Sequence, residues 1–498
     1  MDPDTPRDRD MNIRIGRVTY LMLLATSGVL WLDSRSVSSV EAITPQTIYL
    51  SPGGNIQSAV DAAPSGTTFV LRSGIYRMQS VTPKQNDTFL GQGPGVVLNG
   101  STILTFRPAS TANRLWVARA IATPSSAESN RYYQTGCEQN HSLCAFTQDL
   151  FIDGQLQTPA NGLAGLRPGQ WFFDRSHSLA YLPADPQGHV VELGMTPYAF
   201  SGPAGGVTIR NLTVEKYASW PQRGAIGGDT ASLGAFWKVD RVEVRWNHGT
   251  GVGLGSSSQI LNSFIHHNGQ LGAAVHGKSS MVAGNEISWN NYIDFKWDAE
   301  AGGAKFCETS DLVVRSNYVH DNNGTGLWTD IGAVGTLYEK NTVVRNKRNG
   351  IQHEISYGGV IRYNVVKDNG SIPTSSLWYS QILLQASSGV QVYDNTIEVA
   401  AGYGNGIGIM NENRGHGKYG PYVAANNSIH SNTITYLGSS GYSGLDDSAK
   451  NNSAVGNVFD SNRYITAQSG AYHWMWLRPI TWKQFQAVGQ ETHGSCCK

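Results

Sequence analysis

The sequence predicts an all-β solenoid in which short parallel strands stack coil upon coil. Its main evidence is an asparagine that recurs before apolar residues at a nearly regular interval. The members are Asn262, Asn285, Asn317, Asn341, Asn364 and Asn395. By subtraction the intervals are 23, 32, 24, 23 and 31 residues, which is too long for a coiled coil and too short for a domain. Each interval reads as two short strands around an Asn corner. Such a unit cannot bury its apolar side alone, so neighbouring units must stack.

The charge composition argues against some classes of binding partner. The chain has 498 residues, and Lys+Arg equals Asp+Glu at 37 each. This balance offers no basic surface to nucleic acid or to an anionic membrane, so we expect neither as a partner. The 13 Trp and 22 Tyr suit a protein with exposed carbohydrate-binding faces, and equally a large protein with many packed loops.

The N-terminus carries the features of a targeting signal. Two arginines precede the apolar run 18–32, and Val40-Glu41-Ala42 is a suitable cleavage site. The run is too short and too interrupted for a membrane span. We therefore expect residues 1–42 to be a signal peptide and the mature protein to be a secreted monomer, extracellular or periplasmic. An uncleaved N-terminal anchor is the alternative.

Residues 43–100 read as an N-terminal cap and a first coil. Gly53-Gly54 opens a helix over Ile56–Ala62, and Pro64-Ser65-Gly66 ends it. A short amphipathic helix at this place covers the open end of a strand stack. Here the sequence resembles the N-terminal cap of the pectin-lyase-like right-handed parallel β-helix proteins. That resemblance implies a right-handed parallel β-helix and the secreted carbohydrate-active enzymes of this superfamily.

The Asn-containing repeat is interrupted after the first coil and then continues. Over residues 101–195, runs of alternating polarity predict a small inserted antiparallel β module. Residues 196–465 carry the main β-helix. Within the C-terminal cap and tail, 466–498, the stretch TWKQFQAVGQ predicts a helix with Thr481 as N-cap and Gly489 past its end.

The five cysteines fit an oxidising compartment loosely. Cys137 and Cys144 lie close enough in the module to form a disulfide. Cys307, inside the repeat, is expected to be a buried apolar residue rather than a nucleophile. Cys496 and Cys497 lie in a tail that could be disordered. The sequence holds no C-x-x-C pair, which argues against structural zinc.

Counting from the Asn corners brings two acids together. Thirteen residues after Asn317 is Asp330, and thirteen after Asn341 is Glu354, so GLWTDI aligns with GIQHEI. Strand alternation directs Trp328, Asp330, Gln352 and Glu354 outward, and Leu327, Thr329, Ile331 and His353 inward. Adjacent strands lie about 4.8 Å apart. Two carboxylates therefore stack on one outer face.

The two long intervals add loops beside this pair. We expect the excess of the 32-residue interval to bulge out before Ala304, which places Lys305 at the position equivalent to Asp330. The acids of that loop are Asp294, Asp298 and Glu300. The excess of the 31-residue interval supplies Trp378 and Tyr379. Together the loops would form the walls of a cleft.

The first interpretation is a glycoside hydrolase that needs no cofactor. Two carboxyl groups about 5 Å apart match the spacing of retaining enzymes. We expect Lys305 to keep Asp330 ionised as the nucleophile, and the neighbouring carboxylate to raise the pKa of Glu354 for the acid/base role. Glu300 could replace either partner and give a wider, inverting spacing. The predicted substrate-binding residues are Trp328 as a sugar platform, Gln352, Trp378, Tyr379, Arg414 and His416.

The second interpretation is a polysaccharide lyase or C5-epimerase for a uronate polymer. The stretch DAEAGGAK resembles the acid-x-acid-x₄-Lys site of chondroitinase-B-like and alginate-lyase β-helix enzymes. The resemblance implies Ca²⁺ held by Asp298 and Glu300, with Lys305 as the base, and Asn268 is a further candidate ligand. That family carries an Arg proton donor on the following coil, where this chain has Leu327-Trp328-Thr329-Asp330.

The third interpretation is a non-catalytic, adhesin-like solenoid that only binds glycans. Charges on the outside of a solenoid are usually solvated, and an Asp–Lys stack relieves repulsion between strands. Fold-level analogy favours carbohydrate in all three interpretations. We expect an enzyme that cleaves glycosidic bonds of a polysaccharide, with hydrolysis ahead of elimination.

Overall fold

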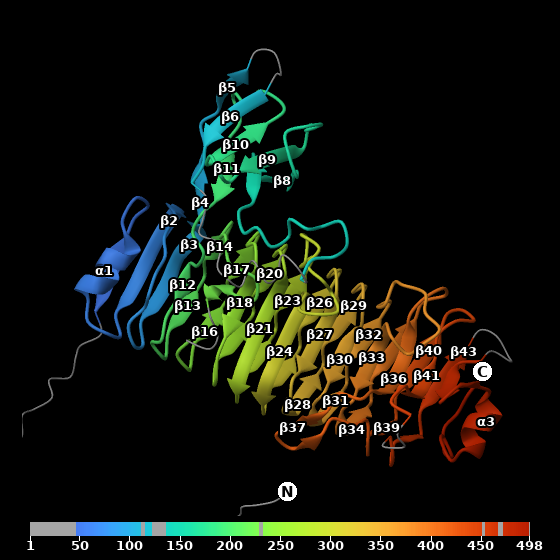
Figure 1. The fold of residues 1–498 in the computed structure, drawn as a ribbon. Coiled ribbons are helices and arrows are strands. Elements are labelled where there is room, and N and C mark those ends of the chain that lie inside the picture. Colours follow the sequence, from blue (N-terminus) through green and yellow to red (C-terminus); the bar gives the residue numbers. More distant parts are fainter. Residues whose placement is uncertain are drawn as a thin grey trace, which may run out of the picture. The chain divides into compact units, whose positions relative to one another are not determined.

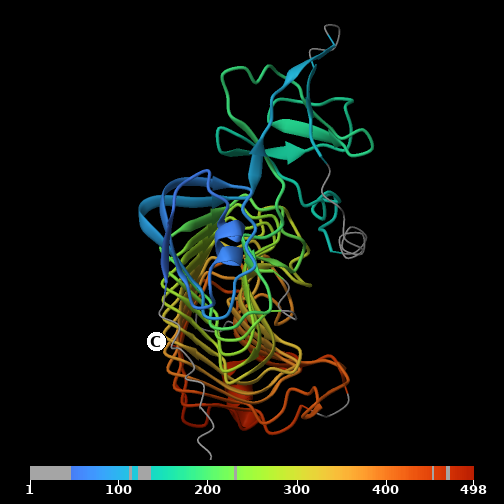
Figure 2. The same ribbon diagram turned by 90° about the vertical axis from the view of Figure 1, so that its left-hand side faces the viewer.

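Three short strands make each coil, and the equivalent strands of successive coils form three stacks (Figure 1). The computed structural model describes residues 46–110, 115–121, 136–228, 233–450, 454–466 and 472–497. The predicted signal peptide, residues 1–42, lies outside the described residues. In the part of the chain that is described, no helix is long and apolar enough to cross a membrane. Figure 2, from the end that carries α1, shows the coils overlying one another.

The helix begins with three strands, β1 (Thr47–Leu50), β2 (Thr68–Arg77) and β3 (Thr88–Asn99), that pair in parallel. The long strands β2 and β3 contribute to the first two stacks at once, because β3 pairs with both β13 and β14. The first stack continues with β13 (Thr208–Arg210), β16 (Lys238–Asp240), β19 (Gln259–Leu261), β22 (Met281–Ala283), β25 (Val313–Arg315), β28 (Val334–Glu339), β31 (Tyr357–Arg362), β34 (Ser388–Tyr393), β39 (Ser428–His430) and β42 (Val458–Asp460).

The second stack continues from β3 through the middle strand of each coil. Its strands are β14 (Thr213–Glu215), β17 (Glu243–Arg245), β20 (Phe264–His266), β23 (Glu286–Ser288), β26 (Tyr318–His320), β29 (Thr342–Val344), β32 (Val365–Lys367), β35 (Thr396–Val399), β40 (Thr433–Tyr436) and β43 (Arg463–Thr466).

The third stack carries the candidate site. Its strands are β12 (Phe200–Ser201), β15 (Gly224–Gly227), β18 (Thr250–Leu254), β21 (Leu271–Lys278), β24 (Gly302–Ser310), β27 (Thr325–Asp330), β30 (Ile351–Glu354), β33 (Ser380–Gln385), β36 (Asn405–Asn411), β41 (Ser443–Asp447) and β44 (Trp474–Trp476). Two short hairpin strands, β37 (His416–Gly417) and β38 (Gly420–Pro421), follow β36, and β45 (Pro479–Ile480) turns back on β44.

The core is the inside of the coil, filled by one apolar side chain from the middle of each short strand. In the second stack Val244, Ile265, Ile287, Val319 and Val343 lie in register and are 0% exposed. Burial of such a side chain contributes roughly 1.5–3 kcal/mol. Stacking therefore supplies the stability that a single coil lacks.

A ladder of buried asparagines runs along the corner between the first and second stacks. Each Oδ1 accepts hydrogen bonds from the backbone N–H and Nδ2 of the preceding member, as between Asn285 and Asn317 (both 3.0 Å). The members are Asn285, Asn317, Asn341, Asn364, Asn395, Asn432 and Asn462. The predicted equivalence of the recurring asparagines is wrong for Asn262, which is exposed, because Ser263 holds the buried position and its backbone N–H donates to Asn285 Oδ1 at 3.0 Å. Glu491 ends the ladder by accepting from Asn462 Nδ2 at 2.6 Å.

A second ladder, which the sequence analysis missed, lies at the corner between the second and third stacks. Its members are Asn247, Asn268, Asn290, Asn322, Asn346, Asn369 and Gln381. Asn290, Asn322, Asn346 and Asn369 each lie five residues after a member of the first ladder, as Asn290 follows Asn285, whereas Gln381 comes from strand β33. The two ladders fix the entry of the chain into the second and third stacks.

Both predicted capping helices are present. In α1 (Ile56–Ala62) the N-cap is Asn55, whose side chain accepts from Ser58 N at 2.8 Å, and Ile56 is buried against the first coil. In α3 (Trp482–Ala487) Thr481 is the N-cap of a capping box, as predicted. Gly489 follows the helix with φ +82°, a left-handed conformation that favours glycine.

The inserted antiparallel module is also present, with a small core of its own. Its strands are β4 (Ser101–Ile103), β5 (Arg107–Ser110), β6 (Leu115–Arg119), β7 (Leu150–Ile152), β8 (Gln155–Pro159), β9 (Gln170–Asp174), β10 (Leu179–Leu182) and β11 (Val191–Gly194), in the order β4-β11-β7-β8-β9-β10-β6-β5. All pairs are antiparallel except β8 with β9. The Cys137–Cys144 disulfide is formed, and Cys496 and Cys497 are bonded to each other.

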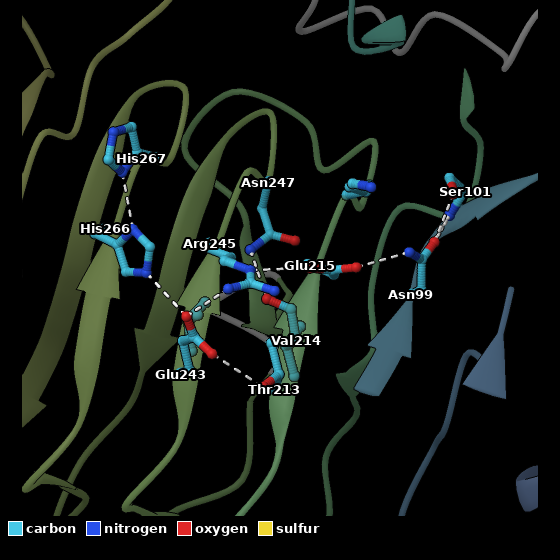
Figure 3. A network of polar contacts seen from close by, with 12 residues as sticks. Asn99, Ser101, Thr213, Val214, Glu215, Glu243, Arg245, Asn247, His266 and His267 are labelled. Carbon is cyan, nitrogen blue, oxygen red and sulfur yellow. Dashed lines mark hydrogen bonds and ion pairs between the residues drawn. The ribbon is translucent and has the colours of Figure 1, made fainter. Parts of the chain in front are cut away.

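A buried polar network joins this module to the coils. Glu192 of β11 forms ion pairs with Lys216 and with Arg77 (2.7 Å). It also accepts from Asn99, which donates to Glu215 Oε1 at 2.8 Å. Figure 3 shows how the contacts continue across the coils from Asn99 through Glu215 to the residues of β17 and β20. Because each buried charge here has an opposite partner, the network holds the module at the first coils.

Candidate active site

Asp330 and Glu354 lie on the outward face of the third stack, at the ends of neighbouring strands β27 and β30. The register pairs Trp328 with Gln352 and Thr329 with His353, so the two acids follow each other on adjacent coils. This is the alignment that the Asn count predicts. His353 points inward as expected, is 1% exposed and meets Thr329 Oγ1 at 2.6 Å.

Lys305 does not occupy the position predicted for it. The register places Lys305 beside Trp328, and Cys307 beside Asp330. The difference is two residues, because counting along the long coil could not locate its extra residues. The ammonium still reaches the acid, with Lys305 Nζ 2.8 Å from Asp330 Oδ2. Cys307 is buried as expected, and burial raises the pKa of its thiol, so it stays protonated.

Lys305 is a buried cation shared by two carboxylates. Its Nζ lies 2.5 Å from Glu300 Oε2 and donates to Ala299 O at 2.8 Å, and its side chain is 3% exposed. Burial lowers the pKa of Lys305, but the carboxylates of Glu300 and Asp330 outweigh burial, so the pKa is raised. Lys305 therefore remains charged at neutral pH and neutralises Asp330.

Glu354 is as buried as Asp330, at 5% and 6% exposed. Its Oε2 accepts from Trp328 Nε1 (3.0 Å) and Gln352 Nε2 (2.9 Å), and its Oε1 lies 2.5 Å from Arg414 Nη1. Burial raises the pKa of Glu354, the Asp330 carboxylate raises it further, and Arg414 opposes both. The net shift is upward, which favours the protonated form of Glu354.

Two of the predicted substrate-binding residues have other positions. The prediction that Trp328 is a sugar platform is wrong, because the residue is 2% exposed and Lys305 Nζ lies 3.7 Å from its ring centre. Gln352 is buried and hydrogen-bonds Gln385 as well as Glu354, so both predicted residues hold Glu354 in place. The prediction that Ile331 points inward is also wrong. Ile331 is 45% exposed, since the chain turns there with φ +54°.

Arg348, which the sequence did not indicate, connects the loop of the 31-residue interval to the site by lying over Trp378. Its guanidinium lies 4.8 Å from the ring centre of Trp378 and 5.7 Å from that of Trp328. Arg348 Nη1 donates to Trp297 O at 3.3 Å, which links the two long loops. Tyr379, half-buried, follows Trp378 in the same loop. The sequence does show a basic residue just before β30, but counting from the Asn corners aligns only residues within strands and therefore did not locate Arg348.

The loop after β36 contributes Arg414 but not His416. Arg414 contacts Glu354 and lies 3.5 Å from Glu412 Oε2, and Glu412 accepts from Gln385 Nε2 at 2.6 Å. His416 is exposed in the β37–β38 hairpin. Arg414 therefore contacts the acid pair, and His416 lies in the exposed hairpin instead.

The residues named for Ca²⁺ do not fit a cation site. Asn268 belongs to the second ladder, where its amide is bonded to Asn247 and Asn290 and is 0% exposed. Glu300 is taken by Lys305, and Asp298 faces Lys296 at 3.9 Å. Within the described ranges, no three His, Cys, Asp or Glu side chains are grouped so that they could hold a metal ion.

Comparisons with known proteins agree on the fold. Residues 225–381 match the family model described as "Right handed beta helix region". A structure of XylC with xylose superposes with a TM-score of 0.64 at 14% identity, covering 84% of this chain and 83% of that chain. The A-module of the Azotobacter vinelandii mannuronan C-5 epimerase AlgE4 gives a TM-score of 0.48 at 15% identity, over 84% of this chain and 94% of that one.

A GH136 lacto-N-biosidase from Eubacterium ramulus is a more remote match. Its TM-score is 0.34 at 11% identity, over 85% of this chain and 62% of that chain. No curated protein sequence matches the chain. At these identities the likeness concerns the fold. The family model and the likeness to XylC agree with the predicted right-handed parallel β-helix, and the structure itself shows the N-terminal capping helix and the inserted antiparallel module.

Proposed function

We propose that the protein is a glycoside hydrolase of the retaining type, with Asp330 as nucleophile and Glu354 as acid/base. The observation that carries the proposal is the pair itself. The two residues end neighbouring strands, whose backbones lie about 4.8 Å apart, and retaining enzymes hold their two carboxyl groups at a similar separation of about 5–5.5 Å. Carbohydrate as the substrate class is supported by analogy with XylC, a protein of the same fold solved with xylose.

The surroundings of the two acids suit different roles. Asp330 contacts the Lys305 ammonium, and its Oδ1 accepts from Ile331 N at 2.8 Å, which orients the carboxylate. Burial and the Asp330 carboxylate raise the pKa of Glu354, which favours its protonated form. Two neighbouring carboxyl groups with separated proton affinities are the usual arrangement of a nucleophile and a proton donor.

The reaction then takes two balanced steps. In the first, Glu354 gives its proton to the glycosidic oxygen while Asp330 bonds to the anomeric carbon and the bond to the leaving sugar breaks. In the second, Glu354 takes a proton from water, the water oxygen bonds to the anomeric carbon, and the ester to Asp330 breaks. Glu354 ends protonated and Asp330 ionised, as they began.

Elimination has less support. A base at C5 must accept a proton, and the raised pKa of Lys305 keeps its ammonium charged. The surroundings of Asn268 and Glu300 do not support a Ca²⁺ site either. Because Lys305 is held between Glu300 and Asp330, we assign it to neutralising Asp330.

We further propose that the protein is exported. The Cys137–Cys144 disulfide supports this, because such bonds persist in oxidising compartments. A periplasmic or extracellular location also suits an enzyme whose substrate is a polysaccharide.

The test is a panel of polysaccharides and oligosaccharides read for new reducing ends and for the ultraviolet absorbance of unsaturated uronides. We expect reducing ends without that absorbance, and a loss of at least about a thousandfold in Asp330→Asn and Glu354→Gln. Absorbance that appears with wild-type protein and disappears with a chelator would favour the lyase. Binding without turnover, retained in both variants, would favour the non-catalytic solenoid.

A further inference from the structure

A small cavity of about 100 Å³ lies on the third stack, immediately N-terminal to the acid pair. The residues that line it are Gln222, Arg223, Thr250, Leu271, Ala274, His276, Glu300, Lys305 and Cys307. Cys307 is the direct neighbour of Asp330 across the β24–β27 pair. The cavity therefore begins about one strand spacing, roughly 4.8 Å, from the proposed nucleophile.

The hollow exists because one outward row of the stack carries small residues. Gly253 pairs with Ala274, and Ala274 pairs with Lys305. The side chains at this position are therefore small on β18 and β21 and long on β24. Lys305 and Glu300 form the end next to the acids. Arg223 lies at the other end, because it precedes β15, which pairs with β18.

Two polar side chains in this cavity lack protein partners. Thr250 is 1% exposed, and its Oγ1 has no hydrogen-bond partner among the described residues. A buried hydroxyl without a partner destabilises the protein unless a ligand or water satisfies it. Among the same residues, no hydrogen bond reaches the imidazole of His276. Burial lowers the pKa of His276, although Glu300 opposes this, so the ring is neutral and can both donate and accept.

We propose that this cavity binds a single sugar residue at the end of the substrate chain, with Thr250 and His276 as specificity-determining contacts to its hydroxyl groups. The protein then acts as an exo-enzyme that releases one sugar unit at a time. This inference rests on the proposed hydrolase, because it places the sugar next to Asp330.

The size and shape of the cavity support one ring rather than a chain. Pockets for drug-sized ligands measure about 300–1,000 Å³, and this one has about a third of the smallest value. Gln222 and Arg223 line the end of the cavity away from the acids. A sugar chain that enters past Asp330 would therefore end at these two residues. A sugar hydroxyl donates and accepts at once, which matches a threonine hydroxyl beside a neutral imidazole.

The test compares two cavity variants with one matched control. Ala274→Leu fills the cavity without changing an acid, and Thr250→Val removes one hydroxyl at nearly constant shape. Ala401→Leu adds the same bulk at an exposed position. Hydrolysis is measured with 4-nitrophenyl glycosides of single sugars and by the products from oligosaccharides. Binding of free monosaccharides to Asp330→Asn protein, alone and combined with each cavity variant, is measured by saturation-transfer NMR.

We expect wild-type protein to release single sugars. KM should rise about tenfold in Thr250→Val, as for one lost hydrogen bond, and more in Ala274→Leu, with unchanged melting temperatures and no effect of Ala401→Leu. Release of mixed internal oligosaccharides that Ala274→Leu does not alter would overturn the cavity's role and leave the hydrolase intact. Monosaccharide binding that Ala274→Leu abolishes, without any turnover by wild-type protein, would support the sugar site and overturn the hydrolase.

Discussion

Removing Arg414 should move the pH profile of the enzyme in a direction that the structure specifies. Arg414 Nη1 lies 2.5 Å from Glu354 Oε1 and favours the ionised form of this acid. In Arg414→Ala burial and the Asp330 carboxylate still raise the pKa of Glu354, and the more weakly acting Lys305 is the cation that still lowers it. The first chemical step needs protonated Glu354, so activity falls as pH rises through that pKa. The alkaline limb of kcat/KM should therefore shift upward.

The size of the shift follows from the contact. A charge-assisted hydrogen bond contributes roughly 1.5–3 kcal/mol. The Arg414 side chain is 35% exposed, so solvent screening reduces this to about 1–1.5 kcal/mol. At about 1.36 kcal/mol per pKa unit, the alkaline limb should move by about one pH unit.

The assay is kcat/KM against pH on the best substrate of the panel, for wild-type protein, Arg414→Ala and Lys418→Ala. Lys418 is the matched control because it lies in the same loop and packs on Tyr419, 5.2 Å from the ring centre. Lys418→Ala should leave the limb in place. An unchanged or lowered limb in Arg414→Ala would refute the assignment of Glu354 as the proton donor.

Three further predictions concern stability and loop support. Asn285→Ala should lower the free energy of unfolding by about 2–4 kcal/mol in chemical denaturation, because the three hydrogen bonds of its side chain are lost. Asn161→Ala, at an exposed position, should change it by less than about 0.5 kcal/mol. Burial raises the pKa of Glu491 to about 7, so the contribution of Glu491 to the free energy of unfolding is complete at acid pH and falls by about 3 kcal/mol as pH rises from about 4.5 through 7. Glu491→Gln should flatten this pH dependence of the free energy of unfolding, and an unchanged slope would contradict the prediction. Replacing Cys137 and Cys144 by Ser should lower kcat several-fold with little change in the melting temperature of the coils, because the loop that holds these cysteines hydrogen-bonds the segment that leads to Glu300. Full activity in this variant would refute the role of the disulfide loop in supporting that segment.

Much of the architecture could be predicted because strands repeat with a fixed period. Once Asn317 and Asn341 are equivalent, Asp330 and Glu354 must lie on neighbouring coils, and strand alternation places both outside. The regular spacing fails where a coil is long. There the position of the extra residues depends on loop packing, which is why Lys305 lies beside Trp328 rather than beside Asp330.

Other features of the site depend on contacts that no local pattern carries. Arg414 meets Glu354 from sixty residues further along the chain, and Arg348 reaches Trp378 from a corner between strands. Trp328 is buried because Lys305 of the neighbouring strand and Arg348 lie against its ring. The second ladder was visible in the sequence, because Asn290, Asn322, Asn346 and Asn369 each recur five residues after a member of the first ladder.

The most direct test of the central claim is the anomeric configuration of the first-formed product, followed by proton NMR during hydrolysis of a substrate with a defined linkage. A nucleophilic Asp330 paired with Glu354 predicts that the product first appears with the configuration of the substrate and then mutarotates. First appearance of the opposite anomer would show that water attacks directly, and would contradict the stacked pair as nucleophile and acid/base.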